Sequence, residues 1–98
     1  MIARIVSFEL RPERLDDYRR LFAEQVEPVN RDHKCQAVHS LQKRDDAGRY
    51  AIMSLWHHER DLSEMRASDR YQQVLEALRD LVQGDFNDVL WQSVSDVG

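Results

Sequence analysis

Two apolar stripes of helical period divide the chain and limit which elements can lie beside them. They run through Leu15, Tyr18, Leu21, Phe22, Val26 and Val29, and through Tyr71, Val74, Leu75, Leu78, Leu81 and Val82. Spacings of three and four, with charged residues between them, are typical of amphipathic helices. We expect Pro28 to close the first helix, Ser68 and Asp69 to cap the second, and Gly84-Asp85 to end it.

Four runs rich in β-branched and aromatic residues surround these stripes, and such residues favour strands. The runs cover residues 2–10, 35–43, 50–56 and 86–94. Asp45-Asp46-Ala47-Gly48 is a turn segment that would join the middle two runs as a hairpin. A short helix carrying Leu62 and Met65 is expected before the last long helix. This order predicts an α+β, ferredoxin-like βαββαβ fold with a four-stranded antiparallel sheet.

Apolar side chains on both faces of the middle strands indicate that one chain does not cover its own sheet. The first strand points Ile5 to one side and Val6 and Phe8 to the other, and residues 50–56 repeat the pattern. A sheet with one wet face would alternate apolar and polar residues instead. Leaving roughly 600 Å² of apolar surface in water would forgo on the order of 15 kcal/mol. We therefore expect a homodimer, with a half-apolar monomer as the alternative.

Length and charge narrow the class of protein. The 98 residues suit a single domain over residues 1–98, and 42% apolar with 33% charged residues is typical of a globular protein. A net charge of −4 argues against nucleic-acid or anionic-membrane partners, because both need concentrated positive charge. Residues 1–6 do not read as a secretion signal, and no apolar run approaches the ~18 residues of a membrane span. We expect a cytoplasmic protein.

Several segments, in their order and spacing, resemble the antibiotic biosynthesis monooxygenase family of dimeric α+β barrels. They are Leu10-Arg11-Pro12-Glu13, Val26-Glu27-Pro28, Cys35, Leu55-Trp56 and Ala67-Ser68-Asp69-Arg70-Tyr71. The resemblance covers nearly the whole chain and implies a homodimer with a small-molecule pocket between sheet and helices. Some members oxidise polycyclic phenols with O₂ without metal or flavin. Others degrade haem, act on signalling molecules or have no known reaction, so fold alone does not fix function.

Departures from the family pattern shape the expected function. Haem-degrading relatives carry Asn, Trp and His where this chain has Val6, Met65 and Leu75, so haem degradation is not expected. Many other relatives place histidines where this chain has Met65 and Arg70. The resemblance implies a cofactor-independent monooxygenase-like enzyme acting on a small aromatic or enolisable metabolite. Loss of both histidines leaves a non-catalytic ligand-binding or stress-response dimer open, and a structural interaction module is a third alternative.

Four residues are candidates for binding the substrate. Trp56 matches a family aromatic at the pocket border, and its flat ring and N–H suit a planar ligand, although core packing explains it equally. Met65 and Tyr71, around the Ala-Ser segment, are candidates by the same resemblance. Ser7 shares a strand face with Ala3 and is a small hydrogen-bonding group.

Two residues are candidates for catalysis. His39 titrates near neutrality and could move a proton from a phenol, with a satisfied, partly buried histidine as the common alternative. Arg4 places a charge on a central strand, where an unpaired ion would be costly. It could hold an oxyanion, or pair with Glu9, Asp88 or a carboxylate of the partner chain.

Metal binding and cysteine chemistry are not expected. His33, His57-His58 and Glu59 lack the spacing of metal ligands, so we expect neither a metal site nor another cofactor. Cys35 is the single cysteine, which excludes an intramolecular disulfide and is typical of a small core residue.

Overall fold

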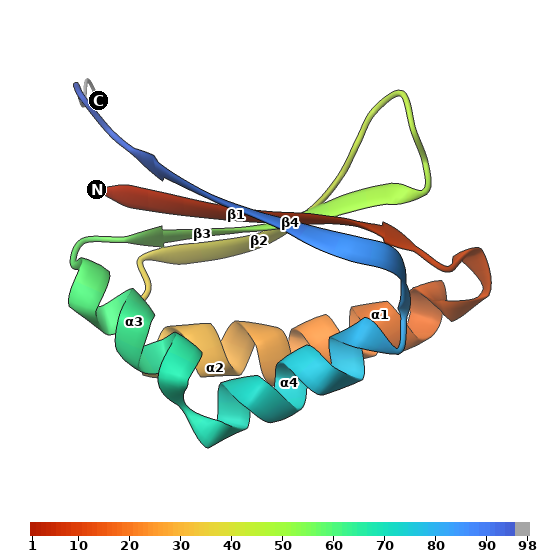
Figure 1. Ribbon diagram of the computed structural model, residues 1–98, viewed down its shortest axis with the longest axis horizontal. Coiled ribbons are helices and arrows are strands. Elements are labelled where there is room, and N and C mark those ends of the chain that lie inside the picture. Colours follow the sequence, from red (N-terminus) through yellow and green to blue (C-terminus); the bar gives the residue numbers. More distant parts are fainter. Residues whose placement is uncertain (96–98) are drawn as a thin grey trace.

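The computed structural model describes residues 1–95, which form a four-stranded sheet with the helices on one side (Figure 1). The first part comprises β1 (Ile2–Leu10), a 3-10 turn (Pro12–Arg14), α1 (Leu15–Leu21), a π-helical turn η2 (Phe22–Val26) and α2 (Glu27–Asp32). The second part comprises β2 (Ala37–Gln42), β3 (Arg49–Trp56), α3 (Glu59–Ala67), α4 (Asp69–Arg79) and β4 (Val82–Gln92).

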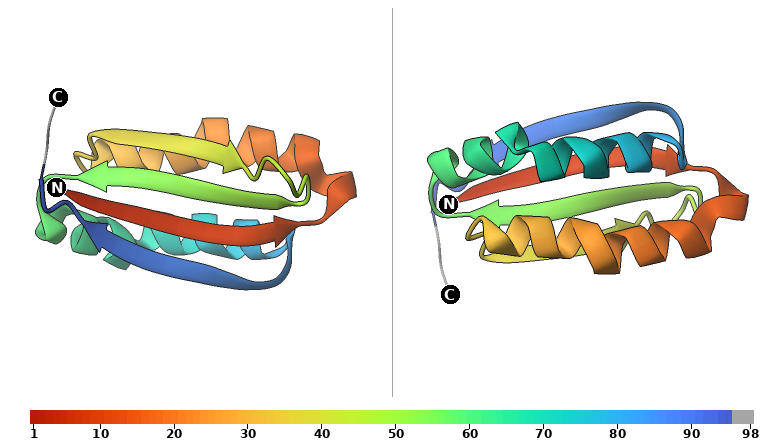
Figure 2. Two further views of the ribbon diagram at one scale, coloured as in Figure 1. Left: turned by 90° about the horizontal axis from the view of Figure 1, so that it is seen from above. Right: turned by 90° about the horizontal axis from the view of Figure 1, so that it is seen from below.

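The strand order is β2-β3-β1-β4, and neighbouring strands are antiparallel. This is the ferredoxin-like topology that the sequence predicts. Seen from below, α1 and α2 lie under β2 and β3, whereas α4 lies under β1 and β4 (Figure 2). The α1–α2 segment and α4 therefore lie side by side in one helical layer on one face of the sheet. In the sheet, β1 lies between β3 and β4.

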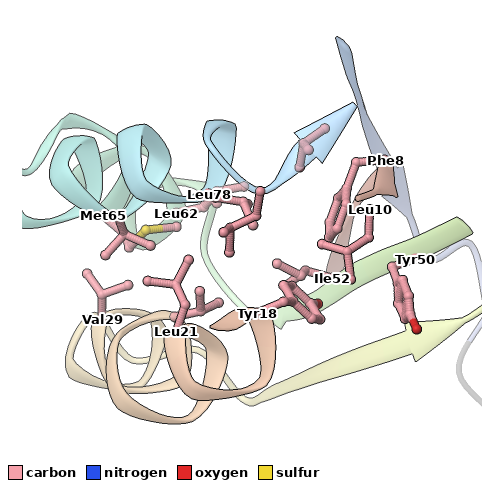
Figure 3. Packing of buried hydrophobic residues seen from close by; sticks show 14 of the residues in the cluster. Phe8, Leu10, Tyr18, Leu21, Val29, Tyr50, Ile52, Leu62, Met65 and Leu78 are labelled. Carbon is pink, nitrogen blue, oxygen red and sulfur yellow. The ribbon is translucent and has the colours of Figure 1, made fainter. Parts of the chain in front are cut away.

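The core forms where alternate residues of the central strands meet the helices. In β1 and β3, Phe8, Ile52 and Trp56 are buried among side chains from the helices. Figure 3 shows side chains of α1, α2, α3 and α4 packing in the space between the sheet and the helices. Phe8 meets Tyr18 edge to face with the ring centroids 5.5 Å apart, a favourable aromatic geometry.

No helix within residues 1–95 covers the other face of the sheet (Figure 1). By the strand register, Leu41, Val89 and Trp91 lie on this face and are 43%, 36% and 61% exposed. Apolar groups thus project from both faces, as the sequence predicts. We call this helix-free side, which includes these three residues, the open face.

The prediction that Pro28 closes the first helix is wrong, because the helical path continues to Asp32. Proline has no N–H to donate, and its ring crowds the carbonyl group four residues earlier. The chain widens just before it: the Glu27 amide donates to the carbonyl of Phe22, five residues back. Pro28 then occupies the first turn of α2, where a missing N–H is tolerated.

The predicted end of the last helix is also wrong. α4 ends at Arg79, and β4 begins at Val82 rather than at residue 86. Leu81 and Val82 are buried, as the apolar stripe indicates, but they belong to the turn and the strand. Gly84 has φ 83° inside β4, where the pairing with β1 shifts register. Glycine permits such a bulge, so here it interrupts a strand and does not end a helix.

Candidate functional site

A cavity of about 390 Å³ lies between the sheet and the helices. Its apolar wall includes Val6 and Ile52 from β1 and β3, and Val29 and Leu78 from α2 and α4. Polar groups line it as well, and they come from β1, β3, β4 and the helices. A concave, largely apolar pocket with a few convergent polar groups is the usual form of a small-molecule site.

Arg4 is the central polar group of this cavity. Its side chain leans from β1 toward β4, where Nε and Nη2 donate to the two carboxylate oxygens of Asp88 at 3.1 and 2.7 Å. Nη2 also donates to the hydroxyl oxygen of Tyr71 at 2.8 Å. Of the partners predicted for Arg4, the structure therefore selects Asp88. The residue is 6% exposed, so this pairing offsets a desolvation cost that would otherwise be severe.

The ionisation of this pair is set by its contacts. Burial alone would lower the pKa of Arg4, but the hydrogen bonds with Asp88 and Tyr71 raise it above its ordinary value. Burial would raise the pKa of Asp88, but the hydrogen bond and charge of Arg4, with the charge of Arg66, lower it. Both groups are therefore charged at neutral pH, and Asp88 is a weak base.

Tyr71 is placed by the start of α4. Ser68 caps the helix, and its Oγ accepts a hydrogen bond from the Tyr71 amide at 3.1 Å. The Tyr71 hydroxyl oxygen accepts from Arg4, so the hydroxyl hydrogen can point elsewhere. No acceptor for that hydrogen is found among residues 1–95, and Tyr71 lines the cavity. The hydroxyl hydrogen therefore has no partner within residues 1–95.

Two further arginines line the cavity beside β4. Arg66 approaches the Asp88 carboxylate at 3.6 Å, and Arg79 lies over the Phe86 ring at 5.9 Å from its centroid. Together with Arg4 they set three positive charges against Asp88, the one acidic residue lining this cavity in the described part of the chain. The lining therefore favours an anionic ligand.

Trp56 and Met65 lie in the core and not on the cavity wall. Both side chains are 0% exposed. Trp56 Nε1 donates to Ser54 Oγ at 2.9 Å, and Ser54 does line the cavity. Trp56 therefore contacts the cavity lining by its hydrogen bond to Ser54. Its burial in the core explains why an aromatic residue ends β3.

Ser7 and His39 lie on the open face, so the sheet separates them from the cavity. Register pairs His39 with Met53 and Ser7 with Ala51, both of which face away from the helices. Ser7 borders a shallow hollow there, together with Leu41 and Asn87. Of the six predicted site residues, the structure brings Arg4 and Tyr71 together at the cavity. The roles of all six stay predictions.

Sequence reasoning missed Asn30 and Ser54, two buried polar residues that line the cavity. Asn30 follows Val26 by four residues, on the buried stripe of the first helical segment. Ser54 interrupts the buried face of β3 between Ile52 and Trp56. A polar residue at an apolar position of a periodic pattern was the available signal for both.

Other candidate chemistry is not assembled in the described part of the chain. Across residues 1–95, no group of three or more His, Cys, Asp or Glu side chains could hold a metal ion. Burial raises the pKa of the half-buried Cys35 thiol, which disfavours the reactive thiolate. None of the helices in this range is both long and apolar enough to cross a membrane.

Comparison with known proteins agrees with this architecture. A structure described as an antibiotic biosynthesis monooxygenase superposes with a TM-score of 0.82 at 22% identity, covering 97% of this chain and 100% of that one. A protein of Mycobacterium tuberculosis gives 0.83 at 18% identity, covering 99% and 98% of the two chains. A candidate antibiotic biosynthesis monooxygenase of Deinococcus radiodurans gives 0.86 at 14% identity, covering 100% and 97%.

Such low identities establish the fold alone. No curated protein is significantly similar to this chain in sequence. Residues 1–77, however, match the family described as antibiotic biosynthesis monooxygenase. Because the match covers most of the chain, the protein is a member of the antibiotic biosynthesis monooxygenase family.

Proposed function

We propose that the protein is a cofactor-independent monooxygenase acting on a small aromatic or enolisable compound held in the cavity. One observation carries the proposal: the buried Arg4 guanidinium orients the Tyr71 hydroxyl at 2.8 Å and leaves its hydrogen free for a ligand. A phenolate or enolate oxygen could accept that hydrogen bond beside a positive charge. Preorganised donors of this kind stabilise charge that develops on a substrate oxygen.

In the proposed reaction, the bound substrate loses a proton to the solvent and becomes an electron-rich anion. The anion reduces O₂ directly, and a carbon–oxygen bond forms. After the oxygen–oxygen bond breaks, one oxygen atom remains on the carbon as a carbonyl group and the other leaves as water. For a ring CH₂ group, the two hydrogens lost by the carbon appear in that water, so the reaction needs no further reductant.

The remaining lining supports this role. Arg66 and Arg79 add positive charge to the lining, which lowers the cost of ionising a bound hydroxyl group. The apolar wall at Val6, Val29 and Ile52 offers contact to a flat ring and excludes water from the reacting carbon.

Oxygen uptake tests the proposal. Anthrone, whose enol is a polycyclic phenol, is supplied with ¹⁸O₂, and we expect uptake with one labelled oxygen in the product. Tyr71→Phe removes the free donor and Arg4→Gln the charge, and each should lower kcat/KM by about 100-fold. Arg19→Gln, at a side chain 71% exposed on α1, is the matched control and should leave the rate unchanged. Equal rates in wild type and Tyr71→Phe would overturn the assignment.

A non-catalytic ligand-binding protein is the second candidate, and the lack of a base favours it. No histidine lines the cavity among residues 1–95, and the lining carboxylate of Asp88 is engaged by Arg4 with a lowered pKa. Such a protein would bind phenols tightly and take up no O₂. Calorimetric binding alongside the uptake assay separates the two candidates.

We also propose that a second copy of the chain covers the open face. Leu41, Val89 and Trp91 would leave water on pairing, and twofold symmetry lets the same face serve both partners. The cavity lies on the other side of the sheet, so pairing through the open face would not cover it.

A further inference from the structure

Asn30 carries an unused acceptor inside the cavity. The residue is 4% exposed, and its Nδ2 donates to the carbonyl of Val26 at 2.8 Å, in the widened turn that precedes Pro28. Because a carbonyl needs a donor, this bond fixes which way the amide points. Oδ1 has no hydrogen-bond partner among residues 1–95. In that range every fully buried side-chain nitrogen or oxygen atom does have a partner, so Oδ1 is not fully buried. Oδ1 therefore opens on the cavity that Asn30 lines.

Ser54 carries an unused donor in the same cavity. Its oxygen accepts from Trp56 Nε1 at 2.9 Å, and no acceptor for its hydroxyl hydrogen is found within residues 1–95. The side chain is 3% exposed and lines the cavity. Trp56 thus holds the oxygen in place, and the hydrogen remains available to a ligand.

Ser54 on β3 lies directly beside Arg4 in the strand register, but the Arg4 guanidinium is held away from β3 by Asp88 on β4. Ser54 belongs to β3 and Asn30 to α2, under the β2–β3 side of the sheet (Figure 2). Arg4 leans the other way, to Asp88 on β4. The cavity lining therefore carries polar groups on β3 and α2 in addition to the cluster of Arg4, Tyr71 and Asp88.

We propose that Asn30 and Ser54 recognise a second, neutral hydroxyl group of the ligand. That hydroxyl would donate to Asn30 Oδ1 and accept from the Ser54 hydroxyl, while the ionised oxygen lies at Arg4 and Tyr71. The inference rests on the proposed function, because it takes the same cavity as the ligand site. It narrows the ligand to a ring compound that carries two separated oxygens, one anionic and one able to donate.

The physical basis is the cost of unpaired polar groups. A ligand that fills the cavity displaces water from Asn30 and Ser54, and a hydrogen atom in place of the hydroxyl leaves both groups unpaired. One such loss typically corresponds to about a tenfold change in affinity. The pair therefore acts through rejection of analogues as well as attraction of the ligand.

Calorimetric binding without O₂ tests the inference with two probes, 2,6-dihydroxynaphthalene and 2-naphthol. Both probes offer one hydroxyl to Arg4 and Tyr71, and only the first offers another. We expect the first to bind about tenfold more tightly to the wild type. Asn30→Leu and Ser54→Ala should each bring the ratio of the two affinities close to one, because only the shared ring contacts then remain. Asn87→Leu, the matched control on the open face, should keep the tenfold ratio.

Equal affinities in the wild type, binding of neither probe, or a ratio that survives both Asn30→Leu and Ser54→Ala would overturn the inference. If Asn30→Leu fails to fold, Ser54→Ala decides the outcome alone. The assay is independent of turnover. If the protein prefers the dihydroxy probe but takes up no O₂, only the proposed reaction is overturned. If it takes up O₂ without that preference, only the role proposed for Asn30 and Ser54 is overturned.

Discussion

A charged residue on a central strand shapes the site at the scale of single residues. Arg4 would be costly inside the fold, and Asp88 offsets that cost across the β1–β4 pairing. The same bidentate contact holds the guanidinium where it also reaches Tyr71. The structural ion pair and the proposed ligand recognition thus depend on one side chain.

Asp88→Asn is expected to lower the free energy of unfolding at pH 7 by about 1–3 kcal/mol, because the buried guanidinium loses its charge partner. The folded-state pKa of Asp88 is depressed, so its contribution is complete above the ordinary value of about 4. That contribution is lost as the pH falls through the folded pKa, where the unfolded state binds more protons. Urea unfolding at pH 7 and in steps below pH 4 measures both effects.

The matched control is Asp16→Asn, at a side chain 93% exposed and 3.9 Å from Arg19. Exposed pairs of this kind contribute little, so stability should not change. An Asp88→Asn protein as stable as the wild type, with the same acid dependence, would contradict the role given to the pair.

At the scale of elements, Ser68 links two helices and sets the position of Tyr71. Its Oγ donates to the Met65 carbonyl at 2.7 Å, closing α3, and accepts from the Tyr71 amide, opening α4. The residue is extended, with φ −71° and ψ 147°, so the chain turns sharply between the helices. The cap therefore places a site residue in the first turn of its helix.

Ser68→Ala should lower the free energy of unfolding by about 1 kcal/mol, because an N-cap acceptor is lost. Ser68→Asp should recover most of that loss, since aspartate caps as well. Ser63→Ala, at an exposed position of α3, is the control and should be close to neutral. Thermal unfolding followed by circular dichroism measures all three, and an unaffected Ser68→Ala would show that the cap does not set α4.

At the scale of the whole molecule, the sheet separates two surfaces of different character. The helix side encloses the cavity, whereas the open face presents apolar side chains to water (Figure 1). With the cavity on one side and the apolar surface on the other, the proposed pairing would leave the proposed ligand site uncovered.

Two leucines of equal exposure test the pairing. Leu41 lies on the open face and Leu90 on the helix side of β4, and both are 43% exposed. Leu41→Glu should shift the mass measured by light scattering from dimer to monomer at micromolar concentration, because it places a charge in the apolar contact. Leu90→Glu should leave a dimer. A monomeric wild type, or a dimer that tolerates Leu41→Glu, would count against pairing through the open face.

Local periodicity was sufficient for the order of elements and the topology of the sheet. Apolar residues spaced three and four positions apart indicate helices, and runs of β-branched and aromatic residues indicate strands. Both patterns involve residues close together in the chain, so they can be recognised before the fold is known. Boundaries were harder to predict. The helix passes Pro28 because the preceding turn widens, and Leu81 is buried in a turn although its spacing continues a helical stripe.

The sequence by itself determined which residues share a strand face, including Ser7 with Ile5, and Arg4 with Phe8. Only the tertiary structure decided which of those faces the helices cover. Both faces of β1 and β3 are apolar, so each was an acceptable partner for a helix. That choice placed Arg4 with Tyr71 in the cavity and left His39 on the other side, because a side chain's surroundings depend on contacts distant in the chain.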